Sequence, residues 1–356
     1  MSNQVANHYF NLFIKSDEGE IKNLTEYTLV NEYLKSNDWL FISPIFFQGF
    51  ELEIFLRLSK TEGNNKEKIL EIITKKFYDL RHTASFIEGY CNRCDCIQPF
   101  LKSIENSLIL TFQKDYEGSI KTIIPIIEGV LRKYLIAEKS FTTETIRPKD
   151  LKESFNLLRL DLIMNYKNEL KTYKDENGNS IDFSEYQIEE LTKKQERYYS
   201  IWFSFVDDFI KNSFYLNTRG QNLTNEINRH SILHEFGLKF DYNFENYIKI
   251  YFLLQFLTWA FLQKEKKSIL NNIQSYLFFE KIVAYERIIK YSEKLLYEKH
   301  ILLKNYDNYN DKILKKKFPE FKNNILSKRY LIIYNLLRKF DQLLWKRNVK
   351  SRTDNK

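Results

Sequence analysis

The most constraining feature of the sequence is residues 244–263, where hydrophobic side chains occupy almost every position of a helical period. A helix that is apolar all round has to be covered on every side. Its longest nearly uncharged part, Ile250 to Leu262, has 13 residues, whereas a helix that spans a bilayer needs about 20. We therefore predict a helix buried among other helices, and no membrane-spanning segment.

Most of the remaining chain repeats apolar residues at the spacing of amphipathic helices. Only 9 Gly and 5 Pro occur among 356 residues, which disfavours a turn-rich β fold. The predicted fold class is all-α, a helical bundle with helical extensions at both ends. The predicted helices cover residues 66–90, 98–113, 118–138, 149–170, 184–216, 223–236, 244–263, 268–302 and 322–347.

Two segments leave alternatives open. The run Trp39 to Phe47 fits either a strand or the edge of a helix, because a short apolar run does not distinguish them. Residues 322–347 place apolar side chains at alternating spacings of four and three, but over fewer than three heptads. A bundle helix that docks on the body is therefore favoured over a coiled coil.

The net charge of +8 is distributed unevenly along the chain. Residues 301–356 carry 15 Lys and Arg and 5 Asp and Glu, a net of +10, so the first 300 residues have a net charge of −2. Two interpretations of the basic end stay open: a solvated lysine-rich surface, or a segment that binds an anionic partner such as RNA.

The three cysteines, Cys91, Cys94 and Cys96, form one cluster. An odd number of clustered thiols is not a disulfide framework, which favours a reducing, cytoplasmic location. Zinc would need a fourth ligand, and the nearest histidine is His82. Ordinary thiols are the favoured interpretation, and whether the cluster binds a metal is left open. Residues 1–15 lack the basic start and apolar run of a secretion signal.

Two of the five histidines lie four residues apart in the run Asn228-Arg229-His230-Ser-Ile-Leu-His234. On a helix, His230 and His234 would share a face and could bind one zinc ion. The metalloprotease pattern, however, has Glu directly after the first histidine, where this chain has Ser231. We therefore predict no metal at this motif.

Arg229 favours a different chemistry. It precedes His234 by five positions, about 140° on an ideal helix, so both side chains can converge on one phosphate. A guanidinium binds phosphate oxygens in a forked geometry, and an imidazole exchanges protons near neutral pH. In RNA the 2′-hydroxyl is a built-in nucleophile, so the motif predicts metal-free cleavage of a phosphodiester.

The motif resembles that of the HEPN superfamily, in which Arg is followed by a polar residue, a short spacer and His. Its context is similar too, because a strongly apolar helix follows it. The segment Ile123 to Arg132 looks like the early helix of bacterial HEPN families linked to abortive infection, where an acidic residue, here Glu128, supports the site. A surface pair of Glu128 with Arg132 is the alternative. The resemblance covers roughly residues 100–265.

The resemblance implies a metal-independent endoribonuclease without a cofactor, working as a homodimer whose two motifs meet in one cleft. Arg229 would clamp the phosphate, His234 would act as general acid or base, and His230 would be a second polar contact. Glu128 and Asn228 would support them. Such proteins act as toxins or effectors of antiphage defence, which implies RNA as substrate and a phage trigger or cognate antitoxin as partner.

The resemblance also divides the chain into three regions. Residues 1–99 form a mostly helical region of unknown role, residues 100–265 the catalytic bundle, and residues 266–356 a helical region with the basic end. The competing functional interpretation is a non-catalytic helical module that binds RNA or protein as a sensor or regulator.

Overall fold

The computed structural model describes residues 2–37, 39, 43, 45, 50–61, 65–175, 177–214, 232–233, 240–267 and 276–303. Within these ranges, the side chains of residues 2–4, 14–24, 50, 212–213, 276–277 and 294–303 are not described. In the described residues all regular structure is helical, apart from one isolated antiparallel bridge between Lys174 and Ser180. The predicted all-α fold class is confirmed.

The described part of the chain is built mainly from α-helices, with short 3-10 and π segments between some of them. In chain order these elements are α1 (Ser2–Ser36), α2 (Phe50–Leu58), α3 (Lys66–Phe77), α4 (Leu80–Ser85), the π-helix η1 (Phe86–Tyr90), the 3-10 helices η2 (Cys91–Arg93) and η3 (Gln98–Phe100), α5 (Leu101–Phe112), α6 (Tyr116–Lys139), α7 (Pro148–Lys171), α8 (Glu185–Phe209), the π-helix η4 (Ile210–Phe214), α10 (Phe244–Lys264) and α11 (Tyr276–Leu303).

The single helix predicted over residues 66–90 is wrong. The structure has a break at Tyr78 and Asp79, between α3 and α4, and continues from α4 into η1. The carboxylate of Asp79 accepts a hydrogen bond from the backbone N–H of Arg81 and so caps the start of α4. Aspartate at this position satisfies a backbone donor that a new helix leaves unpaired, which favours a restart over a continuous helix.

The predicted helices that correspond to α5, α6, α7 and α10 are confirmed to within two or three residues. The helix predicted over 184–216 is α8 followed by η4, and the described part of the helix predicted over 268–302 is α11. Of the open run 39–47, the described residues Trp39, Ser43 and Ile45 are buried and belong to neither a helix nor a strand. The helix predicted over 322–347 lies outside the described residues, as does the helix predicted over 223–236 except for its residues 232–233.

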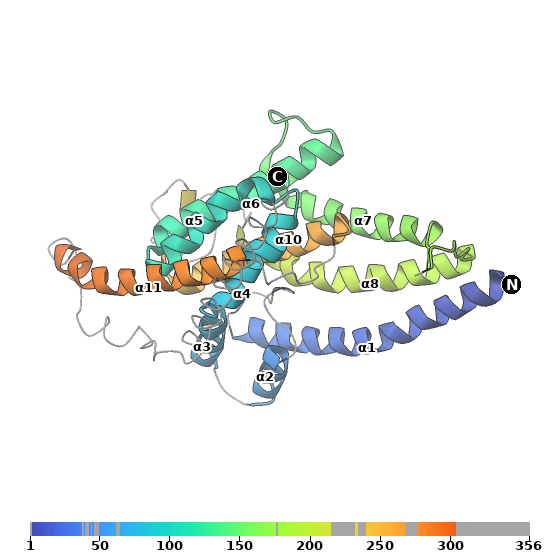
Figure 1. The fold of residues 1–356 in the computed structure, drawn as a ribbon, viewed down its shortest axis with the longest axis horizontal. Helices are drawn as coiled ribbons and strands as arrows, with labels where there is room; N and C mark the ends of the chain where they lie inside the picture. The colour runs from blue at the N-terminus through green and yellow to red at the C-terminus, as the bar shows by residue number, and fades with distance from the viewer. Residues whose placement is uncertain are drawn as a thin grey trace, which may run out of the picture.

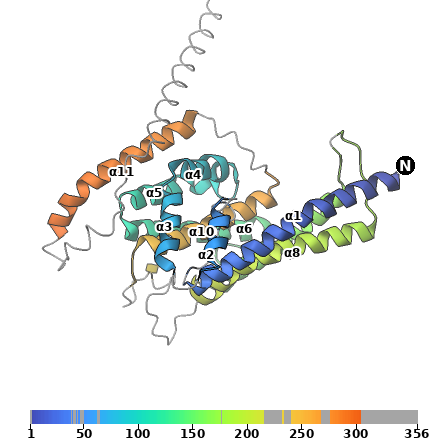
Figure 2. The ribbon, with the colours of Figure 1, turned by 90° about the horizontal axis from the view of Figure 1, so that it is seen from below.

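The helices form a bundle with a long arm (Figures 1 and 2). In the arm, α7 and α8 are paired and α1 lies against α8. In the body, α5 and α6 form a second pair, α10 packs on α6 and α7, and α11 crosses α4 and α5. The sequence therefore folds so that α10 is enclosed by helices that precede it in the chain.

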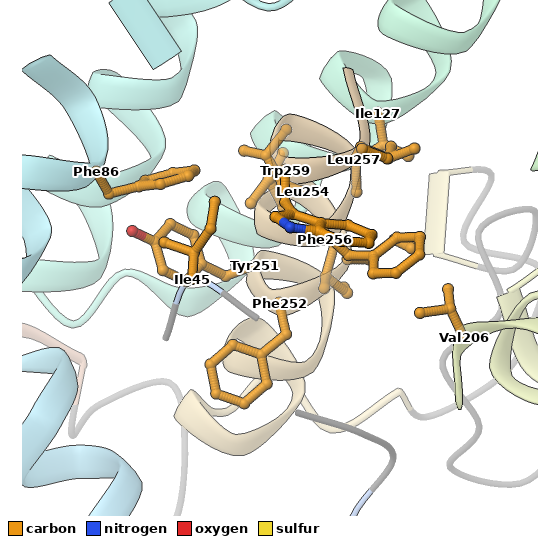
Figure 3. Close-up of a cluster of buried hydrophobic side chains, with 14 of the residues drawn as sticks. Ile45, Phe86, Ile127, Val206, Tyr251, Phe252, Leu254, Phe256, Leu257 and Trp259 are labelled. Carbon is orange, nitrogen blue, oxygen red and sulfur yellow. The ribbon is translucent and has the colours of Figure 1, made fainter. Parts of the chain in front are cut away.

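Helix α10 is the centre of the main core. Every residue from Asn246 to Leu262 is buried, and Figure 3 shows Tyr251, Phe256 and Trp259 projecting from different sides of α10 into surrounding side chains. The prediction of a helix buried on all sides is confirmed. No helix within the described residues is both long enough and apolar enough to cross a membrane. The main core draws side chains from all three predicted regions of the chain, whose boundaries stay a prediction.

A second, smaller core lies at the end of the arm. It joins the first turns of α1, the end of α7 and the start of α8, through buried residues such as Ala6, Leu170 and Leu191. A tight turn between α7 and α8 lies here: Gly178 has a φ of 82°, and Asp175 accepts hydrogen bonds from the backbone of Asn177 and Asn179. Because a positive φ suits glycine, the Asn-Gly-Asn sequence specifies this tight connection.

Candidate functional site

The predicted catalytic residues Arg229, His230 and His234, and the supporting Asn228, lie outside the described residues. Their placement stays a prediction. Within the motif, Ile232 and Leu233 are described and are helical. Ile232 is fully buried and belongs to the main core, and Leu233 packs against that core. The middle of the motif is therefore anchored in the protein interior.

Tyr242 connects this anchor to the start of α10. Its hydroxyl donates a hydrogen bond of 3.5 Å to the backbone carbonyl of Ile232. Its ring lies 4.9 Å from the ring of Phe240 in an edge-to-face arrangement, which is a favourable geometry for aromatic side chains. The aromatic segment before α10 thus contacts the backbone of the motif at Ile232.

A network of hydrogen bonds fixes the turn between Tyr242 and α10. The side chain of Asn243 caps α10 by accepting a hydrogen bond from the backbone N–H of Asn246, at 2.8 Å. The amide of Asn246 in turn donates to the backbone carbonyl of Asp241, at 2.8 Å. Asparagine is among the preferred residues at the start of a helix because it satisfies an otherwise unpaired N–H. These hydrogen bonds therefore fix the backbone from Asp241 into the first turn of α10.

Helix α6 meets the same region through Lys121. The ammonium nitrogen of Lys121 lies 5.5 Å from the centre of the Tyr242 ring, a cation–π contact. The same nitrogen lies 2.8 Å from the carboxylate of Glu117, one turn earlier on α6. Lys121 was not predicted from the sequence, because a lysine on an amphipathic helix carries no local signal of a contact 121 residues away.

The predicted supporting residue Glu128 is half-buried on α6. It lies seven residues after Lys121, and seven residues are close to two helical turns, so the two side chains leave α6 on the same side. They are separated by about 10 Å along the axis. Glu128 therefore lies on the side of α6 that contacts Tyr242, and its supporting role stays a prediction.

The start of α10 also carries a buried lysine, Lys249. Its ammonium nitrogen is 2.6 Å from the carboxylate of Glu245 and 5.3 Å from the centre of the Trp39 ring. Glu245 also pairs with Lys66 at 3.4 Å. A buried lysine needs such partners, because leaving water costs a charged group several kcal/mol. These contacts bind the N-terminal part of the chain to the helix that follows the motif.

The cysteine cluster faces Glu265, just after α10. Both oxygens of this carboxylate accept backbone hydrogen bonds, from Asp95 at 2.9 Å and from Cys96 at 3.1 Å, and the Cys94 thiol donates to it at 3.7 Å. Burial and, to a smaller extent, the negative charge of Glu265 together raise the pKa of the Cys96 thiol to about 11, although Lys133 and Lys264 oppose them. The thiols are thus held protonated, which is unfavourable for metal binding or nucleophilic attack.

The zinc alternative finds no support in the described residues. Among them, no three His, Cys, Asp or Glu side chains lie close enough together to hold one metal ion. His82, the nearest histidine to the cluster in sequence, is half-buried, and removal of its ring from water lowers its pKa to about 3. His82 is therefore uncharged near neutral pH.

Comparison of this chain with known protein families, with curated proteins and with solved structures finds no match.

Proposed function

We propose that the protein is a metal-independent endoribonuclease of the HEPN type and an effector of bacterial antiphage defence. The observation that carries the proposal is the sequence Arg229-His230-Ser-Ile-Leu-His234, which precedes the apolar helix α10 (Phe244–Lys264) in an all-α fold. The burial of Ile232 and its hydrogen bond from Tyr242 support it, because a motif anchored in the core can keep its polar residues in a defined geometry.

The proposed reaction is an attack of the RNA 2′-hydroxyl on the adjacent phosphorus. A base removes the proton of the 2′-hydroxyl, the new bond from O2′ to phosphorus forms, and the bond from phosphorus to O5′ breaks. An acid protonates the departing O5′. The products are a 2′,3′-cyclic phosphate and a 5′-hydroxyl. The reaction consumes no water and uses no metal ion.

Arg229 and His234 have the principal roles in this proposal. The guanidinium of Arg229 binds the phosphate oxygens and stabilises the charge that develops on them. The imidazole of His234 is the general acid or base, since its ordinary pKa of about 6.5 suits proton transfer near neutral pH. His230 provides a second polar contact, and Asn228 and Glu128 orient the others. The protein would act in the cytoplasm as a homodimer whose two motifs meet in one cleft. A phage trigger would activate it, or a cognate antitoxin would keep it inactive.

The test is cleavage of RNA by the purified full-length protein. Arg229→Ala and His234→Ala are each expected to abolish cleavage and growth inhibition, with an unfolding curve that matches the parent protein. His8→Ala, a change of an exposed histidine on α1, is the matched control. Cleavage should persist in EDTA. Full activity of either motif variant would refute the proposal.

The second candidate is a non-catalytic module that binds RNA or protein as a sensor or regulator. The net charge of +10 in residues 301–356 favours it, because clustered positive charge attracts an anionic partner. Expression that is harmless under every condition, phage challenge included, would support this candidate. Removal of residues 304–356 should then lower RNA affinity and weaken its dependence on salt.

A further inference from the structure

One side of α10 carries polar side chains, although that helix lies at the centre of the main core. Tyr247, Tyr251, Gln255 and Thr258 follow one another at intervals of four, four and three residues. On an ideal helix these intervals keep the four side chains within about 80° of the circumference. All four residues are at most 1% exposed. We call these four residues the polar side of α10.

The polar side of α10 faces the segment that follows α4. The ring of Phe86 in η1 lies 5.4 Å from the ring of Tyr251, edge to face (Figure 3). Burial raises the pKa of the Cys91 thiol, which begins η2, and a hydrogen bond with Thr258 opposes the rise. Burial and, to a smaller extent, neighbours that include Cys91 raise the pKa of Tyr251. Because Gln255 lies between Tyr251 and Thr258, its amide is on the side of α10 that faces Cys91.

The two ends of the polar side have hydrogen-bond partners. The hydroxyl of Thr258 donates to the backbone carbonyl of Leu254 at 2.8 Å, and the hydroxyl of Tyr247 accepts from Ser107 at 3.5 Å. In the middle, neither the two polar atoms of the Gln255 amide nor the Tyr251 hydroxyl completes a hydrogen bond with any residue that the structure describes. The unpaired groups are therefore adjacent, one helical turn apart.

A single hydroxyl cannot satisfy Gln255. The amide has an oxygen that accepts and a nitrogen that donates, and the Tyr251 hydroxyl can pair with only one of these ends. Cys91 is a poor substitute, because a thiol is a weak donor and a weak acceptor. Buried polar groups nearly always have a partner, either protein or ordered water, since leaving them unpaired is costly. Gln255 therefore needs a further partner.

From this arrangement we infer that one water molecule is bound between α10 and the segment formed by η1 and η2, joined to Gln255 and Tyr251. The water accepts a hydrogen bond from Nε2 of Gln255 and donates one to the hydroxyl oxygen of Tyr251. That hydroxyl donates to Oε1 of Gln255, so every polar atom of the group has a partner. The sulfur of Cys91 is a third, weaker neighbour for the water. The inference does not depend on the proposed nuclease activity.

The surroundings favour water over a larger ligand. Tyr251, Gln255 and Cys91 are all at most 1% exposed, and the rings of Phe77 and Phe86 pack on Tyr251 at 5.6 and 5.4 Å. A larger molecule would have to displace these aromatic rings, whereas water fits a small polar site with two to four partners.

A line of polar groups connects the site to the surface beside α11. Tyr285 lies near enough to Tyr251 to add slightly to the rise that burial causes in the pKa of its hydroxyl. Tyr285 donates to the carboxylate of Glu105 at 2.9 Å, and 26% of the Glu105 side chain is exposed. Water therefore has a polar route between the solvent and the site.

The direct test is a high-resolution crystal structure of the full-length protein. We expect a density peak within about 2.7–3.2 Å of both Nε2 of Gln255 and the hydroxyl oxygen of Tyr251. An ordered Gln255 whose amide pairs at both ends with protein atoms, without such a peak, would overturn the inference.

Oxygen-17 magnetic relaxation dispersion tests the same site in solution by counting the water molecules that the protein holds. Gln255→Leu is expected to hold one fewer than the parent protein, and Tyr186→Phe, at an exposed tyrosine of α8, to hold the same number. An unchanged count in Gln255→Leu would contradict a water at Gln255.

Two further readouts cover a variant that folds poorly. Tyr251→Phe keeps the ring and removes only the hydroxyl, so it should also lower the number of held waters, and it decides the matter if Gln255→Leu does not fold. In urea, Gln255→Leu should unfold at the same or a lower concentration than the parent protein. A clearly higher concentration would mean that the amide is unpaired in the parent protein, because removing an unpaired buried group stabilises the fold, and would overturn the inference.

Discussion

The ammonium nitrogen of Lys281 on α11 lies 3.3 Å from the carboxylate of Glu88 in η1, and it also pairs with Glu105 on α5. Tyr285, one turn later on α11, donates a hydrogen bond of 2.9 Å to the same Glu105 carboxylate. One lysine therefore serves two carboxylates from two different elements. The ion pairs hold α11 on the body of the bundle.

Replacement of Lys281 should weaken this attachment. Lys281→Met leaves two carboxylates, 15% and 26% exposed, without their cation. We expect a loss of about 1–3 kcal/mol in the free energy of unfolding, measured with urea. Lys290→Met removes an exposed pair with Glu286 on the same helix, and should cost less than about 1 kcal/mol. Equal losses of unfolding free energy in the two variants would show that the Lys281 ion pairs stabilise the fold no more than an exposed pair does.

The burial of His82 predicts a loss of stability in acid. Burial and the nearby Lys76 lower its pKa to about 3 in the folded protein, although Asp79 opposes them, whereas the unfolded value is about 6.5. Below pH 6.5 the unfolded chain binds a proton that the folded protein excludes. The contribution of His82 is therefore complete above pH 6.5 and falls by about 1.4 kcal/mol per pH unit between pH 6 and pH 3.

His82→Gln should remove this part of the pH dependence. Its unfolding free energy, followed from pH 7 to pH 4.5, should decline less steeply than that of the parent protein, whatever its absolute value. His8→Gln, at an exposed position of α1, should leave the slope as it is. A slope that is the same in all three proteins would contradict the assignment to His82.

The cysteine cluster predicts slow alkylation of the folded protein. Because the pKa of Cys96 is raised to about 11, its thiolate is scarce at pH 8, and iodoacetamide should react at least about tenfold more slowly than with an unfolded chain. Glu265→Gln removes a negative charge that raises this pKa, so it should speed the reaction of Cys96. Mass spectrometry of tryptic peptides measures both rates. Rapid modification of Cys96 in the folded parent protein would refute the prediction.

Gly129 of α6 is required by the packing of Phe100. A Cβ atom at Gly129 would lie 2.7 Å from the Phe100 ring, closer than atoms can approach. Gly129→Ala should therefore destabilise by up to about 2 kcal/mol, since overpacking costs about 1–3 kcal/mol and alanine recovers about 1 kcal/mol of helix propensity. Gly89→Ala is the control, because its Cβ would meet no atom closer than 3.6 Å. Urea unfolding compares the two.

The sequence was sufficient to predict those elements that depend on local spacing. In α5, α6, α7 and α8, apolar residues keep helical spacing over long stretches, so only a helix fits these segments. The nearly continuous apolar run of α10 left no solvent-exposed side to assign, and burial on every side followed. The break at Asp79 could not be predicted from this spacing, because apolar residues at helical spacing continue on both sides of it. An aspartate alone does not mark the start of a helix, since aspartates also occur inside helices.

For the candidate site too, some features follow from the sequence and others only from the structure. Arg229 and His234 stand five residues apart, and from this spacing the sequence by itself predicts that they serve one phosphate. The contact of Lys121 with Tyr242, and the hydrogen bond from Tyr242 to Ile232, were decided only by the tertiary structure. The physical reason is that these contacts depend on how α6 and α10 pack, and packing brings together side chains whose separation along the chain carries no signal.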